Sequence, residues 1–381
     1  MEEFGNVHVV SLGGFVIAMV FGFVANKTHF CAMGAISDLL HMESHGRLGA
    51  WFTAIGIAII GTGILQFTGL VDVSKSRYLT PNFGWLGYVV GGVLFGVGMT
   101  LAAGCGQRNL VRFGGGNLKA LVVLLVLGIT AYMTMRGLLG LVRINTVDAA
   151  TVDLSNYGLA DQGLVTSIQA FAGIDDQRWL RAIVAGLLGL AFIGAALRHA
   201  EFRNTFDHIL AGVVLGGTVV AAWYVTGHLG NDEFDPVPVE GISFISSTGN
   251  AVNYLMTFTG STINFGIALV FGVIAGSFLY AILSGNFRIE TFSNRSEMIS
   301  YLVGGALMGF GGILSLGCTI GQGITGMSTL AIGSAIALIS IIFGSALTMK
   351  VEYHLLDERG FFDAVRTGLA ELLIPGLRHA S

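Results

Sequence analysis

Nine windows of mainly apolar residues recur along this chain of 381 residues. Each window is about 17 to 25 residues long, enough for a helix to cross a hydrocarbon layer ~30 Å thick. Charged residues make up only 11% of the chain, against roughly 25% in a soluble domain. An ordinary water-soluble enzyme is therefore excluded, and an all-α polytopic membrane protein with about nine transmembrane helices is predicted. The windows cover residues 8–25, 49–70, 83–103, 118–142, 180–197, 208–226, 262–283, 298–316 and 325–348.

Glycine is the residue that can interrupt these predicted helices. The chain contains 57 glycines but only 4 prolines, and the prolines all fall between or after the apolar windows. Since proline is absent from the windows, any break inside a span has to come from glycine. The shortage of proline also excludes collagen and proline-rich disorder.

The charged residues predict an orientation and exclude nucleic acid as a partner. The net charge of -4 is spread over short clusters, and no basic run could neutralise a phosphate backbone. The connection 227–261 has four acidic residues and no Lys or Arg, so the positive-inside rule places it away from the cytoplasm. The connections 107–119, 198–207 and 284–297, which carry Arg or Lys, are then expected at the cytoplasmic face.

One glycine-rich segment occurs twice. Residues 91–105 and 304–318 both have the pattern GG-x3-G-x-G-x5-G-C. With the orientation above, the first copy runs inward and the second runs outward. Such an inverted repeat is typical of transporters and places a substrate site near the bilayer midplane, between the two halves.

The repeat also predicts how the chain is divided. Residues 1–350 are expected to form a single integral membrane transport domain, and residues 351–381 a C-terminal tail that is either a short interfacial helix or a frayed end. The repeat halves are roughly residues 1–142 and 262–350, linked by residues 143–261.

The three cysteines are the main candidates for a functional role. Cys31, Cys105 and Cys318 each follow an apolar stretch, in small-residue surroundings that contain glycine. Glycine lets the backbone leave a helix, so Cys105 and Cys318 are predicted at unwound points whose N–H groups can face an anion. The thiols would line a passage, because a soft and weakly polar S–H group can contact an anion without trapping it.

Further candidates lie beside the two repeat cysteines. Their polar side chains and free backbone groups are expected either to hold an anion in a vestibule or to cap broken helix ends, and both roles are compatible. These residues are Gly104, Gly106, Gln107, Gly317, Gly321, Gln322 and Thr325.

Other roles for the cysteines are open at this point. They could be small buried hydrophobes, or two of them could form a disulfide that leaves the third unpaired. A metal site is not expected, because no C-x-x-C spacing occurs and the pair His41 and His45 is predicted to lie in a solvated turn. No phosphate-binding loop is present, so no nucleotide or other cofactor is expected.

These cysteine and glycine motifs resemble those of the YeeE/YedE family of bacterial membrane proteins, sulfur-transport proteins that include thiosulfate uptake transporters. The matching pieces are FCAMGA from Phe30, GGVLFGVG from Gly91, GCGQRNL from Gly104, GGALMGFG from Gly304 and GCTIG from Gly317. The resemblance implies an inner-membrane protein with inverted repeats and re-entrant half-helices, pinched at its centre. It also implies that Cys31, Cys105 and Cys318 relay thiosulfate or a similar sulfur compound inward.

The resemblance further implies a separate small cytosolic protein, similar to a sulfurtransferase, that receives the sulfur. It leaves the cargo open, because the family also handles other substrates such as selenium compounds. The chain is thus expected to be a transporter and not an enzyme, one that relays a small sulfur-containing anion past the thiols without covalent bonds, with membrane lipid as its surroundings.

Two alternatives stay open. The first is a membrane thiol redox or sulfurtransferase enzyme that forms a cysteine persulfide, although only Arg108 lies near Cys105 in sequence to lower a thiol pKa. The second is a purely structural scaffold.

Overall fold

The structure is a computed structural model that describes residues 6–173, 176–232, 236–357 and 360–373. The described chain is almost entirely helical, and its two short strands pair antiparallel, Asn82 with Asp153 and Phe83 with Val152. The strands are β1 (Asn82–Phe83) and β2 (Val152–Asp153). The α-helices are α1 (Asn6–Lys27), α2 (Ala32–Ser37), α3 (Gly46–Phe67), α4 (Gly92–Leu101), α5 (Gly106–Gly114), α6 (Leu118–Arg136), α7 (Leu138–Thr146), α8 (Leu164–Ala172), α9 (Gln177–Leu197), α10 (Ala200–Arg203), α11 (Phe206–Tyr224), α12 (Ile245–Met256), α13 (Phe265–Leu283), α14 (Arg295–Leu314), α15 (Ile332–Leu356) and α16 (Phe361–Leu373).

Short 3-10 and π-helical turns connect or extend these helices. The 3-10 turns are η2 (Val73–Lys75), η4 (Asp148–Ala150), η5 (Leu154–Tyr157) and η7 (Phe258–Gly260). The π-helical turns are η1 (Asp38–Met42), η3 (Gly87–Gly91), η6 (Val225–Leu229) and η8 (Gly321–Gly326).

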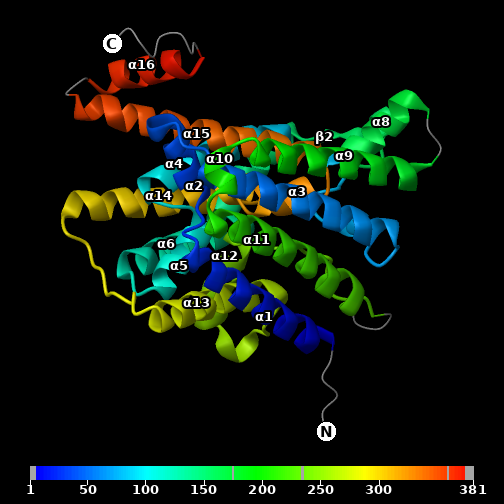
Figure 1. Ribbon diagram of the computed structural model, residues 1–381, viewed down its shortest axis with the longest axis horizontal. Helices are drawn as coiled ribbons and strands as arrows, with labels where there is room; N and C mark the ends of the chain where they lie inside the picture. The colour runs from blue at the N-terminus through cyan, green and yellow to red at the C-terminus, as the bar shows by residue number, and fades with distance from the viewer. Residues whose placement is uncertain (1–5, 174–175, 233–235, 358–359, 374–381) are drawn as a thin grey trace.

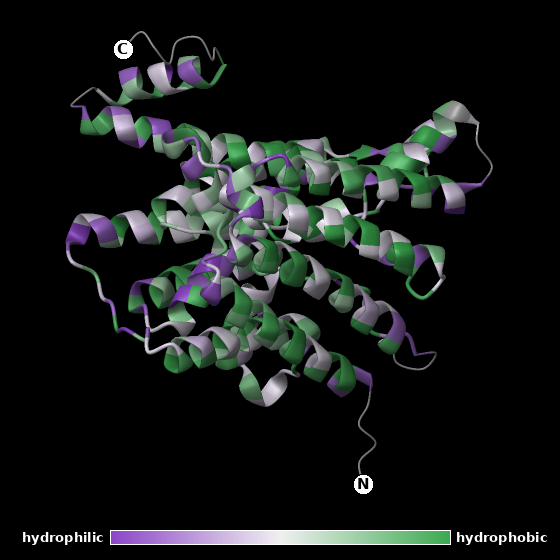
Figure 2. Cartoon of the chain, in the orientation of Figure 1, coloured by the Kyte–Doolittle hydropathy of each residue, from purple (hydrophilic) through white to green (hydrophobic). Residues whose placement is uncertain are grey.

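Among the described residues, nine helical segments are long and apolar enough to cross a membrane, which confirms the expected number of spans. Figure 1 shows most of the long helices lying roughly along one direction. Hydrophobic residues dominate the long helices, and many hydrophilic residues lie near helix ends and connections (Figure 2). Helix α9 is the most peripheral of the nine, because only 17% of its apolar window is buried, as expected for a lipid-facing helix.

Two helices lie where the sequence predicted connections. Residues 106–114, expected in a cytoplasmic connection, form α5, and α12 lies within the predicted polar connection 227–261. The arginines of α5 lower its mean hydropathy, although its other face, with Leu110 and Val111, is buried. In α12 the serines and threonines have the same effect, yet this helix packs closely against α6: a Cβ on Gly128 would lie 3.1 Å from the Thr248 carbonyl oxygen.

The repeated glycines bring α4 and α14 into backbone contact. A Cβ on Gly98 would lie 2.6 Å from the Gly304 carbonyl oxygen, and a Cβ on Gly91 would lie 2.6 Å from that of Gly311. Because Gly91 faces Gly311 and Gly98 faces Gly304, the two helices run antiparallel. Their opposite directions agree with the inverted arrangement expected for this segment, whereas a symmetry that relates the whole halves stays a prediction.

The other glycines of α4 and α14 pack against two further long helices, α15 and α6. In α4, Gly92 and Gly96 lie against α15; in α14, Gly305 and Gly309 lie against α6. Helices α4 and α14 are therefore each closely packed on two sides, against one another and against α15 or α6.

The C-terminal tail is helical over residues 361–373. Helix α15 continues to Leu356, past the expected domain end at residue 350, and α16 packs back on it. Glu371 of α16 accepts contacts at 2.9 Å from both Lys350 Nζ and His354 Nε2 of α15. Residues 374–381, the last part of the predicted tail, lie outside the described residues.

The contact between α4 and α14 predicts the effect of a methyl group. Gly98→Ala should lower the free energy of unfolding by about 2 kcal/mol, because the new Cβ overlaps backbone atoms that have little freedom to move. Denaturation of the purified protein in detergent measures this change. The matched control is Gly186→Ala on α9, where no atom lies within 4 Å of the added Cβ; it should leave stability unchanged or raise it by up to ~1 kcal/mol through helix propensity. Equal losses in the two variants would contradict the proposed role of this contact.

Candidate functional site

The three cysteines share one local backbone geometry. Each lies two residues after a non-glycine residue in the left-handed region, and each is followed by a short helix or a helical turn, namely α2, α5 or, two residues further on, η8. A left-handed residue ends the preceding helix and redirects the chain, so that a new helix can begin at once. The left-handed residues are His29 (φ 51°), Ala103 (φ 52°) and Leu316 (φ 59°).

Each sulfur atom also receives a backbone N–H from the residue three positions later. Gly34 N donates to Cys31 Sγ at 3.3 Å, and Gly321 N donates to Cys318 Sγ at 3.4 Å. The Cys105 thiol interacts in the same way with the backbone N–H of Arg108. A sulfur that accepts an N–H keeps its own S–H proton free to donate elsewhere.

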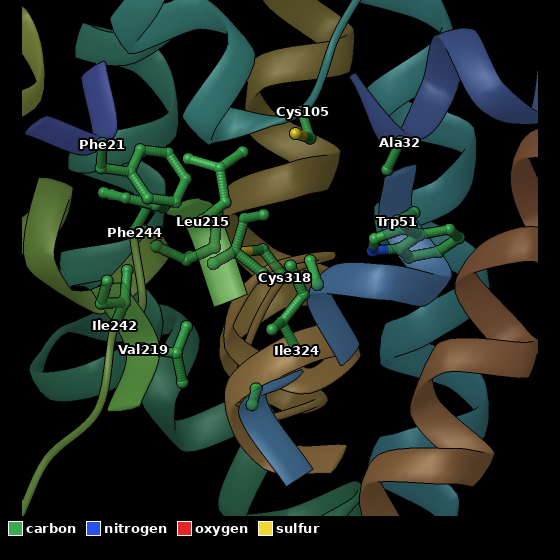
Figure 3. Packing of buried hydrophobic residues seen from close by; sticks show 14 of the residues in the cluster. Phe21, Ala32, Trp51, Cys105, Leu215, Val219, Ile242, Phe244, Cys318 and Ile324 are labelled. Atoms are coloured by element: carbon green, nitrogen blue, oxygen red, sulfur yellow. The ribbon is translucent and has the colours of Figure 1, made fainter. Parts of the chain in front are cut away.

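The fold brings the three thiols together. Cys105 and Cys318 are fully buried and belong to one packed region (Figure 3), whereas Cys31 is half-buried. The Cys105 thiol is within electrostatic range of both Cys31 and Cys318. All three cysteines are free, so the disulfide alternative is not adopted in this structure.

The glycines and polar residues beside Cys105 shape the break between α4 and α5. Gly104 has φ 152°, which favours glycine, and its carbonyl oxygen accepts a hydrogen bond of 2.8 Å from Asn109 Nδ2. Gly106 leaves room for the Ile245 side chain, 3.1 Å from where a Cβ would stand. Gln107 Oε1 lies 3.9 Å from Cys105 Sγ, and its amide nitrogen has no hydrogen-bond partner.

The polar residues after Cys318 are more fully paired. Gln322 donates to the Ser315 carbonyl oxygen and accepts a hydrogen bond of 2.6 Å from Ser334 Oγ, so both ends of its amide are used to hold the chain after α14. Thr325 Oγ1 donates to the Ile242 carbonyl oxygen at 2.7 Å.

Gly317 and Gly321 are closely approached by neighbouring atoms. A Cβ on Gly317 would lie 3.1 Å from Gln322 Cγ, and a Cβ on Gly321 would lie 2.9 Å from Ser243 Oγ. The absence of a side chain at both positions keeps the turn at Cys318 compact.

A cavity of about 460 Å³ lies at the α5 end of the span Gly87–Gly114. It is lined by Arg108, Arg112 and Arg288, with Glu290 as the acidic residue among them. Arg108 is within electrostatic range of both Cys31 and Cys105. In the predicted orientation this is the cytoplasmic end, so we call it the inner cavity.

Two further cavities lie at the opposite end of the same span, where Gly87 lines the larger one. They measure about 610 and 120 Å³, and both are lined by Arg77 and Arg143. The smaller one is also lined by Gly317, the residue before Cys318, and by Ser243. We call this pair the outer cavities.

The outer arginines are held by neighbouring polar groups. Arg77 donates to Ser246 Oγ at 3.3 Å and to Tyr78 Oη at 3.4 Å, and burial raises the pKa of Tyr78, so its phenol stays neutral. Arg143 pairs with Asp148 at 3.1 Å. Arg77 is also within electrostatic range of Cys318. Positive charge is therefore present on both sides of the thiols.

The region between the inner and outer cavities is closely packed at two of the cysteines. Since the side chains of Cys105 and Cys318 contact no solvent, no continuous water-filled channel passes them. Within the described part of the chain, no group of three or more His, Cys, Asp or Glu residues could hold a metal ion.

Several residues at this site were not singled out from the sequence. Arg77 and Arg143 line the outer cavities, although both lie in segments that have little pattern of their own. Ser243 and Trp51 carry buried polar atoms without hydrogen-bond partners, and the buried Thr319 hydroxyl has only the Cys105 sulfur within reach. Only Thr319 had a signal in the sequence, its position directly after Cys318.

Comparisons with known proteins identify a family match and two similar transporters. The sequence profile of a family described as "Sulphur transport" matches residues 27–347. The chain is similar to the thiosulfate transporter TsuA of Escherichia coli (strain K12), with 27% identity over 346 residues, covering 87% of this chain and 92% of that protein. It is also similar to the thiosulfate transporter TsuA of Spirochaeta thermophila, with 26% identity over 337 residues, covering 87% of this chain and 96% of that protein.

The burial of the thiols predicts their order of chemical reactivity. In variants that keep a single cysteine, Cys31 should react with N-ethylmaleimide at least ~10 times faster than Cys105 or Cys318, because the reagent has to reach the sulfur. Mass spectrometry of samples quenched at successive times measures the rates. Reaction of Cys105 or Cys318 as fast as Cys31 would show that the closed packing does not hold in solution.

Proposed function

The chain belongs to the sulphur transport family, and from that membership we propose that it carries thiosulfate, or a closely related sulfur anion, inward across the bacterial inner membrane. The observation that carries the proposal is the placement of three free thiols, alike in backbone geometry, between arginine-lined cavities. The similar TsuA proteins, described as thiosulfate transporters, support this choice of cargo.

Arginines at the cavities lower the cost of bringing a dianion to the protein. A charge pair 4 Å apart gains about 4 kcal/mol at the effective dielectric constant of ~20 that is typical near a protein surface. Arg77, which is hydrogen-bonded to neutral groups, therefore concentrates the anion in the outer cavities, near Cys318, whereas the charge of Arg143 is offset by Asp148. On the other side, Arg108 and the inner cavity receive it.

The thiols carry the anion between Arg77, within electrostatic range of Cys318, and Arg108, within electrostatic range of Cys105 and Cys31. A neutral S–H group donates a weak hydrogen bond to the anion, whereas a thiolate would repel it. Weak contacts at successive positions let the anion advance, because no single position binds it tightly. From the outer side, the order is Cys318, Cys105 and Cys31.

The anion leaves through the inner cavity, next to Arg108 and His29. A separate sulfurtransferase-like protein in the cytosol would then collect the sulfur, as the family resemblance implies. No bond to sulfur forms or breaks in this sequence of steps, which distinguishes it from a persulfide-forming enzyme.

Removal of a thiol should interrupt the route. Cys31→Ala, Cys105→Ala and Cys318→Ala should each lower thiosulfate uptake at least ~10-fold, a difference of about 1.4 kcal/mol in the free-energy profile. Uptake of labelled thiosulfate by cells that lack their own uptake system measures this, after correction for the amount of protein in the membrane. Wild-type rates in all three variants would rule out the relay.

The non-covalent route makes a second, independent prediction. Wild-type protein purified after exposure to thiosulfate should have the mass of the unmodified chain. An added sulfur atom on any of the cysteines, seen by intact-mass spectrometry without reductant, would favour the persulfide enzyme instead.

Loss of the Arg77 charge should change the thiosulfate concentration needed for half-maximal uptake more than the maximum rate of uptake. Arg77→Gln should raise the thiosulfate concentration for half-maximal uptake about 10-fold, because it removes a positive charge from both outer cavities. Lys75→Gln is the matched control, since this exposed lysine lies on the same connection and does not line these cavities. An unchanged half-maximal concentration in Arg77→Gln would contradict the role of the outer cavities.

A further inference from the structure

Two buried side chains next to the Cys105 thiol have donors that no strong acceptor satisfies. The Gln107 Nε2 amide has no hydrogen-bond partner, and the Thr319 Oγ1 hydroxyl has only the weakly accepting Cys105 sulfur within reach. Both residues are fully buried. Gln107 reaches the thiol with its other amide atom, Oε1, at 3.9 Å from Cys105 Sγ, and the Thr319 side chain lies within hydrogen-bonding reach of the same sulfur.

An unpartnered buried donor costs free energy, so native structures usually avoid it. Comparable residues on the same stretch are paired: Gln322 uses both ends of its amide, and the Thr329 hydroxyl donates to the Gly326 carbonyl oxygen at 2.7 Å. The Cys105 sulfur interacts with the N–H of Arg108 and with the Thr319 hydroxyl, and sulfur is a weak acceptor, so Thr319 is only weakly satisfied while Gln107 Nε2 is not satisfied at all. A stronger acceptor, such as the oxygen of an anion on the proposed route, would satisfy both donors better than the protein does.

We propose that Gln107 and Thr319 bind the oxygen atoms of the anion while the Cys105 thiol contacts its sulfur. The proposal rests on the function proposed above and adds a basis for selectivity. Thiosulfate has three oxygens at one end and a soft terminal sulfur at the other. Its oxygens accept hydrogen bonds from N–H and O–H donors, and its sulfur suits a thiol.

In this proposal the residues around Cys105 recognise both ends of thiosulfate, whereas the arginines of the inner and outer cavities recognise only its charge. An amide and a hydroxyl are neutral, so they select for oxygens without holding a dianion as tightly as an arginine would. Sulfate offers oxygens but no terminal sulfur, and hydrosulfide offers sulfur but no oxygens. Neither anion can satisfy the thiol and both donors together.

The test removes each donor without changing the size of the side chain. Thr319→Val and Gln107→Met should each raise the thiosulfate concentration for half-maximal uptake about 10-fold, and Thr319→Ser, which restores a hydroxyl, should recover most of the loss. The matched control is Thr329→Val, in which the lost hydroxyl is one that already has a partner; it should transport like the wild type. All rates are corrected for the amount of protein in the membrane.

A second measurement separates oxygen binding from a change in packing. Sulfite, which has three oxygens but no terminal sulfur, and hydrosulfide, which has no oxygen, compete with labelled thiosulfate. In Thr319→Val, and also in Thr319→Ala if the valine variant is not inserted, inhibition by sulfite should weaken about 10-fold and inhibition by hydrosulfide should not change. Equal shifts for both competitors, or no shift for either, would overturn the proposal.

The outcome also separates this inference from the function on which it rests. Wild-type uptake of thiosulfate together with wild-type behaviour of Thr319→Val and Gln107→Met would refute the role of the two donors and leave the transport function standing. Absence of thiosulfate uptake by the wild type would refute both.

Discussion

Close backbone contact between α4 and α14 is the interaction on which the site depends. Glycine against glycine at two levels lets the helices approach closely, and further glycines seat each helix against α6 or α15. In a membrane, where apolar surfaces gain little from leaving lipid, such close packing is a main source of helix association. Both helices end a few residues later, at the breaks that carry Cys105 and Cys318. The contact therefore fixes the distance between two thiols that lie far apart in the sequence.

The site combines two kinds of polar group in a fixed order. Arginines line the cavities at both ends of the proposed route, and neutral thiols, an amide and a hydroxyl occupy the buried region between these cavities. The charged side chains lie at the cavities, where water screens them, and the fully buried groups are neutral donors. In the proposed route, neutral donors at Cys105 and Cys318 would hold a dianion less firmly than a further arginine there would, so the anion could leave.

The sequence predicts the parts of this structure that depend on local pattern. Apolar windows were sufficient for nine spans, and repeated glycines and cysteines marked the breaks at Cys105 and Cys318. Helix α12 was missed because its serines and threonines look polar in the sequence, although the fold buries them. Arg77 was missed for a different reason, because its proposed role depends on which distant residues it faces, and no spacing along the chain carries that information. Thr319 was missed although it directly follows Cys318 in the sequence.

The full burial of Cys105 and Cys318 bears on how well the protein prevents ions from leaking across the membrane. A permanently hydrated pore would let protons and small ions leak down their electrochemical gradients and would dissipate the membrane potential. The packed region around Cys105 and Cys318 closes such a path in this structure. In the proposed transport cycle, passage therefore begins with a rearrangement of side chains around the arriving ion, and the membrane potential is preserved between one passage and the next.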